Sequence, residues 1–417
     1  MVSANSYDVI IAGGGPAGSS AAIELTSNGA RVLLVEEKTF PRAKLCGEFI
    51  SPECLTHFKR LGVLDQMTSA GGTALSETVF YSRRGHSVAV PTEWFGSGAT
   101  ALGLSRSEMD HKLLDRAKDA GVVVLEDAHA SGLIRERGSV LGISVKTVSA
   151  VNQYRSLVTI DATGRTMALA RHAGHIDAQV GRGGMTRKKK KKKPPFVAFK
   201  VHLENTRVAE GVCEIYFYSG GYGGLSGVEG GASNLCFIVS ADDVRRHGSD
   251  PEVVMREVVM KNARANCTLA NARARTHWLS VSLESFGRRT LTPAPGLLTI
   301  GDAAAFIDPF TGSGMLMALE SGEVAAEIVS RHLPMFRQDS RSELSGIATL
   351  AADYRTEYSR RFNSRLRLSG LLRRAAFVPR LAETAMLLFG SSARLRRRLA
   401  RATRQPGGGR QVRAPGR

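Results

Sequence analysis

Short apolar runs and stretches with helical spacing alternate at the beginning of the chain. The first apolar run, Val9–Ala12, passes through a glycine-rich turn into an alanine-rich stretch, Ser19–Leu25, and a second run, Arg31–Val35, follows. Runs that are apolar at almost every position are typical of strands covered on both faces. The order strand, helix, strand therefore predicts a parallel, doubly wound unit in this part of the chain.

Alternating apolar and polar positions dominate two later regions. Residues 75–92 predict a hairpin that turns at Arg83–His86, and residues 196–239 predict an antiparallel sheet that could roof a pocket. A glycine-rich bend is expected within this sheet at Gly220–Gly231. Most aromatic residues of the sheet would belong to its core, and those that could line a pocket are Phe199, Tyr216, Tyr218 and Tyr222.

The glycine-rich turn has the pattern Gly-x-Gly-x-x-Gly between the first strand and the first helix. Gly13 allows the tight turn, Gly15 lets the backbone approach a pyrophosphate, and Gly18 lets the helix pack close to the strand. Glu36 ends the second strand, near the offset at which an acid accepts hydrogen bonds from a ribose; Glu37 follows at once, so this choice rests on register. Strand, helix and acid together favour a dinucleotide site over an ordinary glycine turn.

A helix is predicted to begin at Ser105, because Ser105 and Glu108 have the spacing of a capping box. Arg106 lies in the first turn of this helix, where a positive charge opposes the helix dipole. Its side chain therefore either faces a cofactor phosphate or is simply exposed.

Two further segments carry candidate chemistry. Phe40–Pro52 is rich in turn residues and either lines the reactive end of the site or forms a surface connection with a buried Cys46. Later, a strand delivers Gly301 and Asp302, and a turn rich in proline and glycine opens a long helix. Free N–H groups at such a helix start can meet developing negative charge.

Length and cysteine content bound the class of protein. A chain of 417 residues with 43% hydrophobic residues can bury a sizeable core. We find neither a secretory signal nor an uncharged apolar stretch of about 18 residues, so no transmembrane helix is expected. The five cysteines lack the spacing of metal ligands. Reduced thiols in the cytoplasm, and no metal site, are therefore predicted.

The net charge of +19 is concentrated in two segments. Residues 365–417 carry 14 arginines and one acidic residue, Lys188–Lys193 adds six charges, and the rest of the chain is neutral. Because no nucleic-acid motif accompanies the charge, we expect no nucleic-acid partner. The basic C-terminal tail is expected either to lie on an anionic membrane, at the inner face, or to cap the body as a solvated segment. The lysine run is assigned no role.

With these motifs, the chain resembles the flavoproteins related to p-hydroxybenzoate hydroxylase, and within them the geranylgeranyl reductase and flavin-dependent dehydrogenase branch. The resemblance covers about the first 330 residues. It rests on the order of the glycine turn with Glu36, the segment Asp161–Arg165, and Gly301–Asp302 with the following turn. Phe40–Gly47 is similar to the segment that lies beside the flavin in this branch.

The resemblance implies that the cofactor is FAD, with NAD(P)H as a transient electron donor. The glycine turn would hold the pyrophosphate, Glu36 the adenosine ribose, Arg106 the phosphate region and Asp302 the ribityl chain. The residues expected to bind the cofactor are Gly13, Gly15, Pro16, Ala17, Gly18, Glu36, Lys44, Arg106, Gly301, Asp302, Pro309, Gly312, Ser313 and Gly314. The candidates for a catalytic role are Cys46, Gly47 and Tyr222.

The implied fold is α/β: a Rossmann-like FAD-binding domain with a three-layer ββα arrangement, an inserted antiparallel-sheet substrate domain and a C-terminal helical extension. The FAD-binding domain is expected at 1–75, 101–177 and 281–332. The remaining parts are expected to be a substrate-domain hairpin at 76–100, the substrate domain at 178–280 with a lysine-rich loop at 186–195, and the helical extension at 333–417.

One departure from the branch decides the expected reaction. Its polyprenyl reductases typically carry a tryptophan-containing motif ending in Phe-Pro, whereas this chain has Gly221–Gly227 there. The tryptophan, isoleucine and proline signature of flavin halogenases is also absent. We therefore expect a monooxygenase of a hydrophobic small molecule, phenolic or polyketide-derived. The alternatives are a reductase or dehydrogenase of an isoprenoid or quinone, and a non-catalytic flavin-binding protein at a membrane surface.

Overall fold

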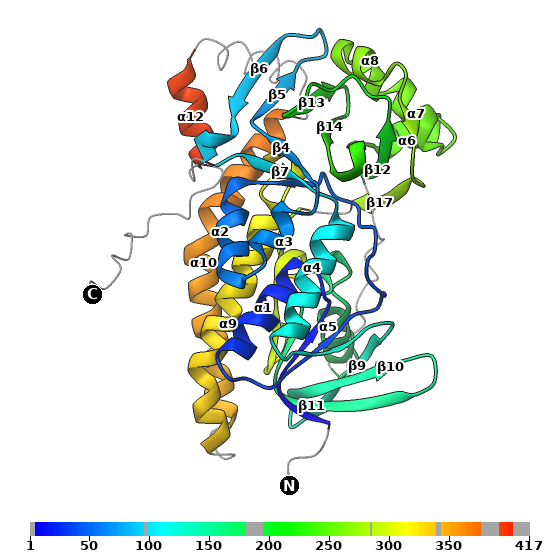
Figure 1. The fold of residues 1–417 in the computed structure, drawn as a ribbon. Coiled ribbons are helices and arrows are strands. Elements are labelled where there is room, and N and C mark those ends of the chain that lie inside the picture. Colours follow the sequence, from blue (N-terminus) through cyan, green and yellow to red (C-terminus); the bar gives the residue numbers. More distant parts are fainter. Residues whose placement is uncertain are drawn as a thin grey trace, which may run out of the picture.

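The computed structural model describes residues 5–95, 99–180, 195–283, 286–338, 343–376 and 392–402. The predicted lysine run at Lys188–Lys193 lies outside these residues. Figure 1 shows an elongated molecule with one large sheet toward each end and two long helices, α9 (Gly314–Gln338) and α10 (Glu343–Ala376), along one side.

The first sheet has the strand order β8-β2-β1-β11-β10-β9, and β19 also pairs with β11. Strands β8, β2, β1, β11 and β19 are parallel neighbours, whereas β11, β10 and β9 form an antiparallel meander. The strands are β1 (Ser6–Ala12), β2 (Val32–Val35), β8 (Val123–Leu125), β9 (His129–Glu136), β10 (Ser139–Lys146), β11 (Val151–Asp161) and β19 (Leu297–Thr299).

Both faces of β1 are covered, which is why its apolar run has no polar interruptions. Val9 and Ile11 pack into the core beneath the helices, and Ile10 and Ala12 pack into the core on the opposite face. The helices around this sheet are α1 (Pro16–Ser27), α4 (Arg106–Asp119), α5 (Ala168–Val180) and α9. The predicted Rossmann-like α/β fold is confirmed.

The second sheet has the order β16-β12-β15-β14-β13-β5-β6, and β17 pairs with β12 along the same edge as β16. It is antiparallel except for the parallel pair β5 and β13, and its β5–β6 hairpin is the predicted one. The strands are β5 (Glu77–Tyr81), β6 (Ser87–Pro91), β12 (Phe196–Glu204), β13 (Val212–Tyr218), β14 (Gly221–Gly227), β15 (Ser233–Ser240), β16 (Arg273–Ala274) and β17 (Leu279–Leu283).

The predicted aromatic lining of this sheet is correct only in part. Phe199, Tyr216 and Tyr218 pack in the core on the face away from the first sheet, while Tyr222 and Phe217 face inward. The reason is the two-residue period of a strand, which places neighbouring residues on opposite faces. Phe217 therefore takes the inward position between Tyr216 and Tyr218.

The glycine-rich bend predicted at Gly220–Gly231 is wrong over most of its length, because Gly221–Gly227 is strand β14 in the middle of the sheet; the chain turns only at the two ends of the range, at Gly220 and at Glu229–Gly231. Its glycines permit close strand contacts. A Cβ atom on Gly221 would lie 1.9 Å from the Ile238 carbonyl oxygen, and one on Gly223 would lie 2.9 Å from the Phe237 side chain. The glycines thus meet a steric requirement of the sheet instead of forming a turn.

Smaller elements complete the fold. The short strands are β3 (Phe49–Ile50), β4 (Thr73–Leu75), β7 (Ala101–Gly103), β18 (Gly287–Arg288) and β20 (Ala305–Phe306). The remaining α-helices are α2 (Pro52–Leu61), α3 (Leu64–Thr68), α6 (Ala241–Arg246), α7 (Pro251–Glu257), α8 (Ala263–Leu269) and α12 (Ala393–Ala402). The 3-10 helices are η1 (Thr92–Phe95), η2 (Gly164–Thr166), η3 (Glu229–Gly231), η4 (Val259–Lys261), η5 (Gly301–Ala303) and η6 (Pro309–Thr311).

The long helix α10 is fixed to α9 and to the first sheet by buried polar contacts. Arg365 pairs with Glu320 of α9 at 2.6 Å, and the Tyr354 hydroxyl donates to the Thr299 carbonyl oxygen at 2.6 Å. Among the described residues, we find no helix that combines the length and the apolar composition needed to cross a bilayer.

Candidate active site

One cavity of about 840 Å³ lies between the two sheets. Its floor is formed by the ends of β1 and β11 and the start of α1, and its roof by the second sheet. The predicted site residues that line it are Gly13, Gly15, Pro16, Ala17, Glu36, Lys44, Cys46, Gly47, Arg106, Tyr222, Gly301, Asp302, Pro309, Gly312 and Gly314. Gly18 and Ser313 are not among the lining residues; both are buried.

The three glycines of the turn meet three different constraints. Gly13 has φ +108°, and a Cβ atom there would lie 2.4 Å from the Ala162 carbonyl oxygen. A Cβ atom on Gly18 would lie 1.9 Å from the Gly13 carbonyl oxygen, so Gly18 allows α1 to approach β1. A Cβ atom on Gly15 would have no such contact: its nearest neighbours would be guanidinium nitrogens of Arg106 at 3.9 Å and of Arg42 at 4.0 Å. The space in front of Gly15 therefore fits an anionic group.

Glu36 is the buried acid of the Glu36–Glu37 pair. Its Oε2 accepts a hydrogen bond from the Gly14 N–H at 2.7 Å and its Oε1 accepts one from the Lys38 N–H at 3.1 Å. The side chain of Glu37 is 63% exposed. Glu36 thus braces the glycine turn and still lines the cavity at the end where a nucleoside would lie.

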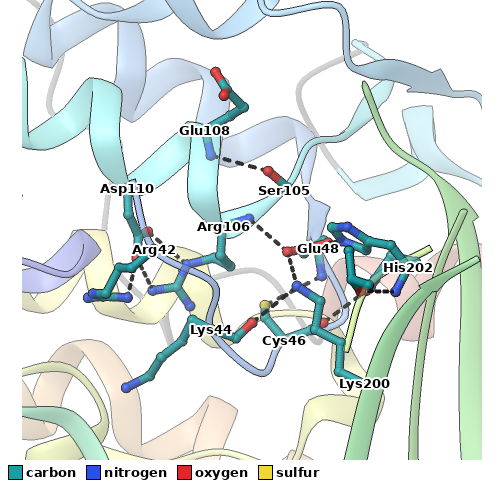
Figure 2. Close-up of polar contacts among 12 residues, drawn as sticks. Arg42, Lys44, Cys46, Glu48, Ser105, Arg106, Glu108, Asp110, Lys200 and His202 are labelled. Atoms are coloured by element: carbon teal, nitrogen blue, oxygen red, sulfur yellow. Dashed lines mark hydrogen bonds and ion pairs between the residues drawn. The ribbon is translucent and has the colours of Figure 1, made fainter. Parts of the chain in front are cut away.

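The Arg106 side chain is only 11% exposed and does not extend into solvent, which removes one of its two predicted alternatives. Its Nε and Nη2 both donate to Asp110 at 2.7 Å, and Arg42 donates to the same carboxylate at 3.2 Å. The predicted helix start at Ser105 is observed: its hydroxyl accepts from the Glu108 N–H at 3.2 Å. Asp110 therefore holds both guanidinium groups (Figure 2), and their nitrogens are the atoms nearest to the space in front of Gly15.

The cavity concentrates positive charge near that space. Burial lowers the pKa of Lys44, and the positive charges of Arg106, Arg42 and Arg165 lower it further. A doubly charged pyrophosphate would relieve this repulsion and favour the charged form of Lys44. Burial also raises the pKa of Asp302, against the opposing effect of the surrounding cations. The donor set and the open space before Gly15 both fit a dinucleotide.

The turn at 308–314 closes another side of the cavity. The Asp308 carboxylate accepts from the Phe310 N–H at 3.0 Å, and Gly312 has φ +58°, a backbone conformation that favours glycine. Helix α9 then begins at Gly314. Because the first N–H groups of a helix have no intrahelical partner, they can donate hydrogen bonds to the electron-rich edge of a ring bound in the cavity.

Glu48 is the centre of a buried charge cluster that sequence reasoning did not find (Figure 2). Its carboxylate pairs with Lys200 Nζ, lies 2.6 Å from His202 Nε2, and accepts from the Arg106 N–H at 2.8 Å. Burial raises the pKa of Glu48, but the hydrogen bond from His202 and the charge of Lys200 bring it below its ordinary value. Glu48 is therefore ionised and ties the segment after Cys46 to strand β12.

Cys46 lies at the cavity wall in front of this cluster. Its Sγ accepts from the Glu48 N–H at 3.4 Å, and its carbonyl oxygen accepts from Asn234 of β15 at 3.1 Å. Burial lowers the pKa of Arg106, but Asp110 and the neighbouring Cys46 sulfur raise it above its ordinary value. Cys46 thus lines the cavity and is not part of a surface connection; its sulfur lies beside a permanent positive charge.

Tyr222 links the second sheet to the 308–314 turn. Its hydroxyl donates to the Asp308 carboxylate at 2.5 Å, and its ring packs edge-on against Phe310 at 5.5 Å between centroids. Burial and the Asp308 carboxylate raise the pKa of Tyr222 well above its ordinary value. The hydroxyl therefore stays protonated and is engaged in fixing the turn.

Beyond Cys46 and the turn, the cavity continues beneath the second sheet as a largely apolar space, here called the apolar chamber. Its lining residues are Phe49, Thr78, Phe80, Val88, Val90, Phe95, Ala198, Cys213, Ile215, Phe217, Gly224, Ser226, Cys236, Ile238, Leu283, Phe306, Phe310, Arg396 and Ala400. The last two belong to α12 and place that helix at one end of the chamber.

Several residues of the site carried no signal strong enough to be predicted. Arg42 and Glu48 lie within the segment already singled out around Cys46, but their partners come from distant elements. For Lys200 and His202, by contrast, the alternating pattern of the strand indicates the face on which they lie. They alternate with Phe199, Val201 and Leu203 along β12, so the period of the strand places them on the face opposite the apolar core.

Comparison with known proteins gives a family and a group of relatives. The FAD binding domain family matches residues 6–324. A digeranylgeranylglycerophospholipid reductase of Methanosarcina mazei is 27% identical over 328 residues, covering 77% of this chain and 74% of that protein. A menaquinone reductase of Mycobacterium tuberculosis is 26% identical over 394 residues, covering 90% and 86%.

Solved structures share the fold. The flavin-dependent brominase Bmp2 superposes with a TM-score of 0.73 at 21% identity, over 95% of this chain and 94% of that chain. A geranylgeranyl bacteriochlorophyll reductase-like protein of Thermoplasma acidophilum has a TM-score of 0.70 at 20% identity, over 96% and 92%.

Proposed function

The chain belongs to the FAD binding domain family and is an FAD-dependent oxidoreductase, and from this premise we propose that it reduces an isoprenoid lipid, either at a double bond of the chain or at a quinone ring. This places the reductase, the alternative expected from the sequence, before the monooxygenase. The observation that carries the proposal is the apolar chamber, which continues from the predicted flavin-facing residues Cys46 and Pro309 to α12.

The lining of the chamber favours an aliphatic chain over a phenol. Buried polar groups of a substrate need hydrogen-bond partners, and leaving one unpaired costs about 1–3 kcal/mol. Within the described lining of the chamber, the polar side chains are few: Thr78, Cys213, Ser226 and Cys236 are uncharged, and Arg396 is charged. The Tyr222 hydroxyl is already engaged with Asp308. The similarity to reductases named for a geranylgeranyl lipid and for menaquinone supports the same substrate class.

The residues divide into those that hold the cofactor and those that serve the reaction. Gly15, the start of α1 and the Arg42–Arg106 pair would hold the pyrophosphate, and Asp302 the ribityl chain. FAD, once reduced by NAD(P)H as a transient donor, supplies a hydride equivalent. Saturating a double bond also requires a proton. Cys46 is placed to donate it, since it lines the cavity and its sulfur lies within hydrogen-bond distance of the Glu48 N–H.

The test is anaerobic turnover. The purified protein with FAD and NAD(P)H should convert a geranylgeranyl lipid or menaquinone without dioxygen, giving a product with two additional hydrogen atoms. Cys46→Ser should slow double-bond reduction, and Cys267→Ser, at an exposed cysteine, serves as the matched control. An absolute requirement for dioxygen would refute the proposal.

A monooxygenase acting on a hydrophobic molecule is the second candidate. Tyr222, Phe217 and Phe310 pack together over the turn at one side of the cavity and would keep water from the reacting centre. In that case one oxygen atom of labelled dioxygen would appear in the product, whereas the reductase incorporates none.

A further inference from the structure

We propose that helix α12 seats the end of the apolar chamber that it borders on an anionic membrane surface, so that a lipid passes from the bilayer into the cavity. The passage of a lipid rests on the proposed function, whereas the membrane contact itself does not. The proposal depends on the two different faces of α12.

The inner face of α12 is fixed to the body of the protein. In Figure 1 this helix lies beside β6, far from α5 and the first sheet. Arg396 donates from Nη1 to the Ala89 carbonyl oxygen at 2.9 Å, and its guanidinium lies 5.8 Å from the centre of the Trp94 ring. Arg396 and Ala400, one helical turn apart, both line the cavity. This end of the chamber is therefore bordered by α12.

The outer face of α12 is basic and has no neutralising acid. Arg394, Arg397, Arg398 and Arg401 are exposed, and Leu395 is exposed beside them at 39%. None of these arginines pairs with a carboxylate in the part of the chain that the structure describes.

On three other surface helices, an arginine pairs with an acidic residue of the same helix. Arg331 of α9 pairs with Glu327, Arg256 of α7 pairs with Glu252, and Arg360 of α10 pairs with Glu357. Such pairs neutralise a solvated helix face. The sequence of α12 contains no acidic residue, so its outer charge remains available to an anionic surface.

A bilayer fits these features better than a nucleic acid does. An interfacial helix combines arginines, which attract anionic lipid headgroups, with apolar residues that enter the acyl boundary. Leu395 among the arginines has this character. A nucleic acid would match the charge, but it would explain neither the exposed leucine nor the position of the helix at the end of an apolar chamber.

The membrane contact is tested by sedimentation of the full-length holoprotein with vesicles. Binding to vesicles of phosphatidylcholine with phosphatidylglycerol should exceed binding to phosphatidylcholine alone and should fall as salt is added. Each arginine near an anionic surface contributes roughly fivefold in affinity. R397Q/R398Q should therefore bind these vesicles roughly 25-fold more weakly. R245Q/R246Q, two exposed arginines of α6 that pair with Asp242 and Asp243, is the matched control and should bind as the wild type does.

Position at the chamber is tested separately. In a Trp278→Phe background Trp94 is the only tryptophan. Arg396→Gln should change the Trp94 emission, whereas R397Q/R398Q should not. With geranylgeranyl lipid or menaquinone as substrate, R397Q/R398Q should lose turnover of vesicle-embedded substrate and keep turnover of detergent-dispersed substrate.

The outcomes separate this proposal from the proposed function. Equal vesicle binding by R397Q/R398Q and the control would overturn the membrane contact. The contact would also be overturned if R397Q/R398Q lost binding to a duplex oligonucleotide and kept its binding to vesicles. Lack of turnover on every isoprenoid substrate would refute the reductase and leave the vesicle result standing.

Discussion

Substitution of Gly15 by valine isolates the predicted pyrophosphate site from the rest of the fold. Gly15 has φ −71° and ψ −176°, which any residue adopts, and its Cβ would find no protein atom within 3.9 Å. The variant should therefore fold. Gly18→Val is the opposite case, because a Cβ 1.9 Å from the Gly13 carbonyl oxygen would disrupt the packing of α1 on β1.

The valine side chain would occupy the space between Gly15, Arg42 and Arg106. If it displaces two charge-assisted hydrogen bonds to the pyrophosphate, the loss is about 3–6 kcal/mol, because each contributes about 1.5–3 kcal/mol. The Kd for FAD should then rise by a factor of about 10² to 10⁴. Gly15→Ala should have a smaller effect of the same sign.

The assay is titration of the apoprotein with FAD, with the midpoint of thermal unfolding of the apoprotein measured beside it. Gly174→Val, at an exposed glycine of α5 with no atom within 4 Å of its Cβ, is the control and should bind FAD normally. If Gly15→Val retains full yellow occupancy and an unchanged Kd, the glycine turn does not hold the cofactor.

Three further predictions follow from single contacts. Asp302→Ala should weaken FAD binding by about 1.5–3 kcal/mol, the value of one charge-assisted hydrogen bond, without unfolding the protein; unchanged affinity would remove Asp302 from the site. Tyr222→Phe keeps the ring that packs on Phe310 but removes the hydrogen bond to Asp308, so it should free the 308–314 turn and change the flavin spectrum. An unchanged flavin spectrum in both Tyr222→Phe and Tyr222→Ala would assign Tyr222 to packing alone. Glu48→Gln leaves Lys200 without its carboxylate partner and should lower the free energy of unfolding at pH 7 by about 3–5 kcal/mol. Because the folded-state pKa of Glu48 is lowered, its contribution is present above about pH 4.3 and is lost as the pH falls through the folded pKa, so the variant should show a flatter loss of stability with acid than the wild type; parallel curves would contradict this.

Local motifs carried most of what the sequence predicted correctly. Gly13 and Gly18 meet the backbone constraints assigned to them, and Glu36 is the buried acid of its pair, because these requirements act within one strand–turn–helix unit. The prediction that Cys46 lies beside the flavin came from the similarity of its segment to a known family, since composition alone also allowed a surface connection.

Features that depend on distant partners were not predicted. Glu48 and Lys200 are 152 positions apart in the chain, and no local pattern indicates that they meet. The inward direction of Phe217, and not of Tyr216, follows from strand register, which the alternating pattern leaves open by one residue. The strand at Gly221–Gly227 was mistaken for a bend because glycine usually marks turns, whereas here it allows close approach of neighbouring strands.

The most direct test of the central claim is a single anaerobic turnover. The FAD of the purified protein is reduced with one equivalent of dithionite, a geranylgeranyl lipid or menaquinone is added without dioxygen, and flavin absorbance is followed. The absorbance of oxidised flavin should return, and the lipid should gain two hydrogen atoms. Flavin that remains reduced with both lipids until dioxygen is admitted would contradict the central claim.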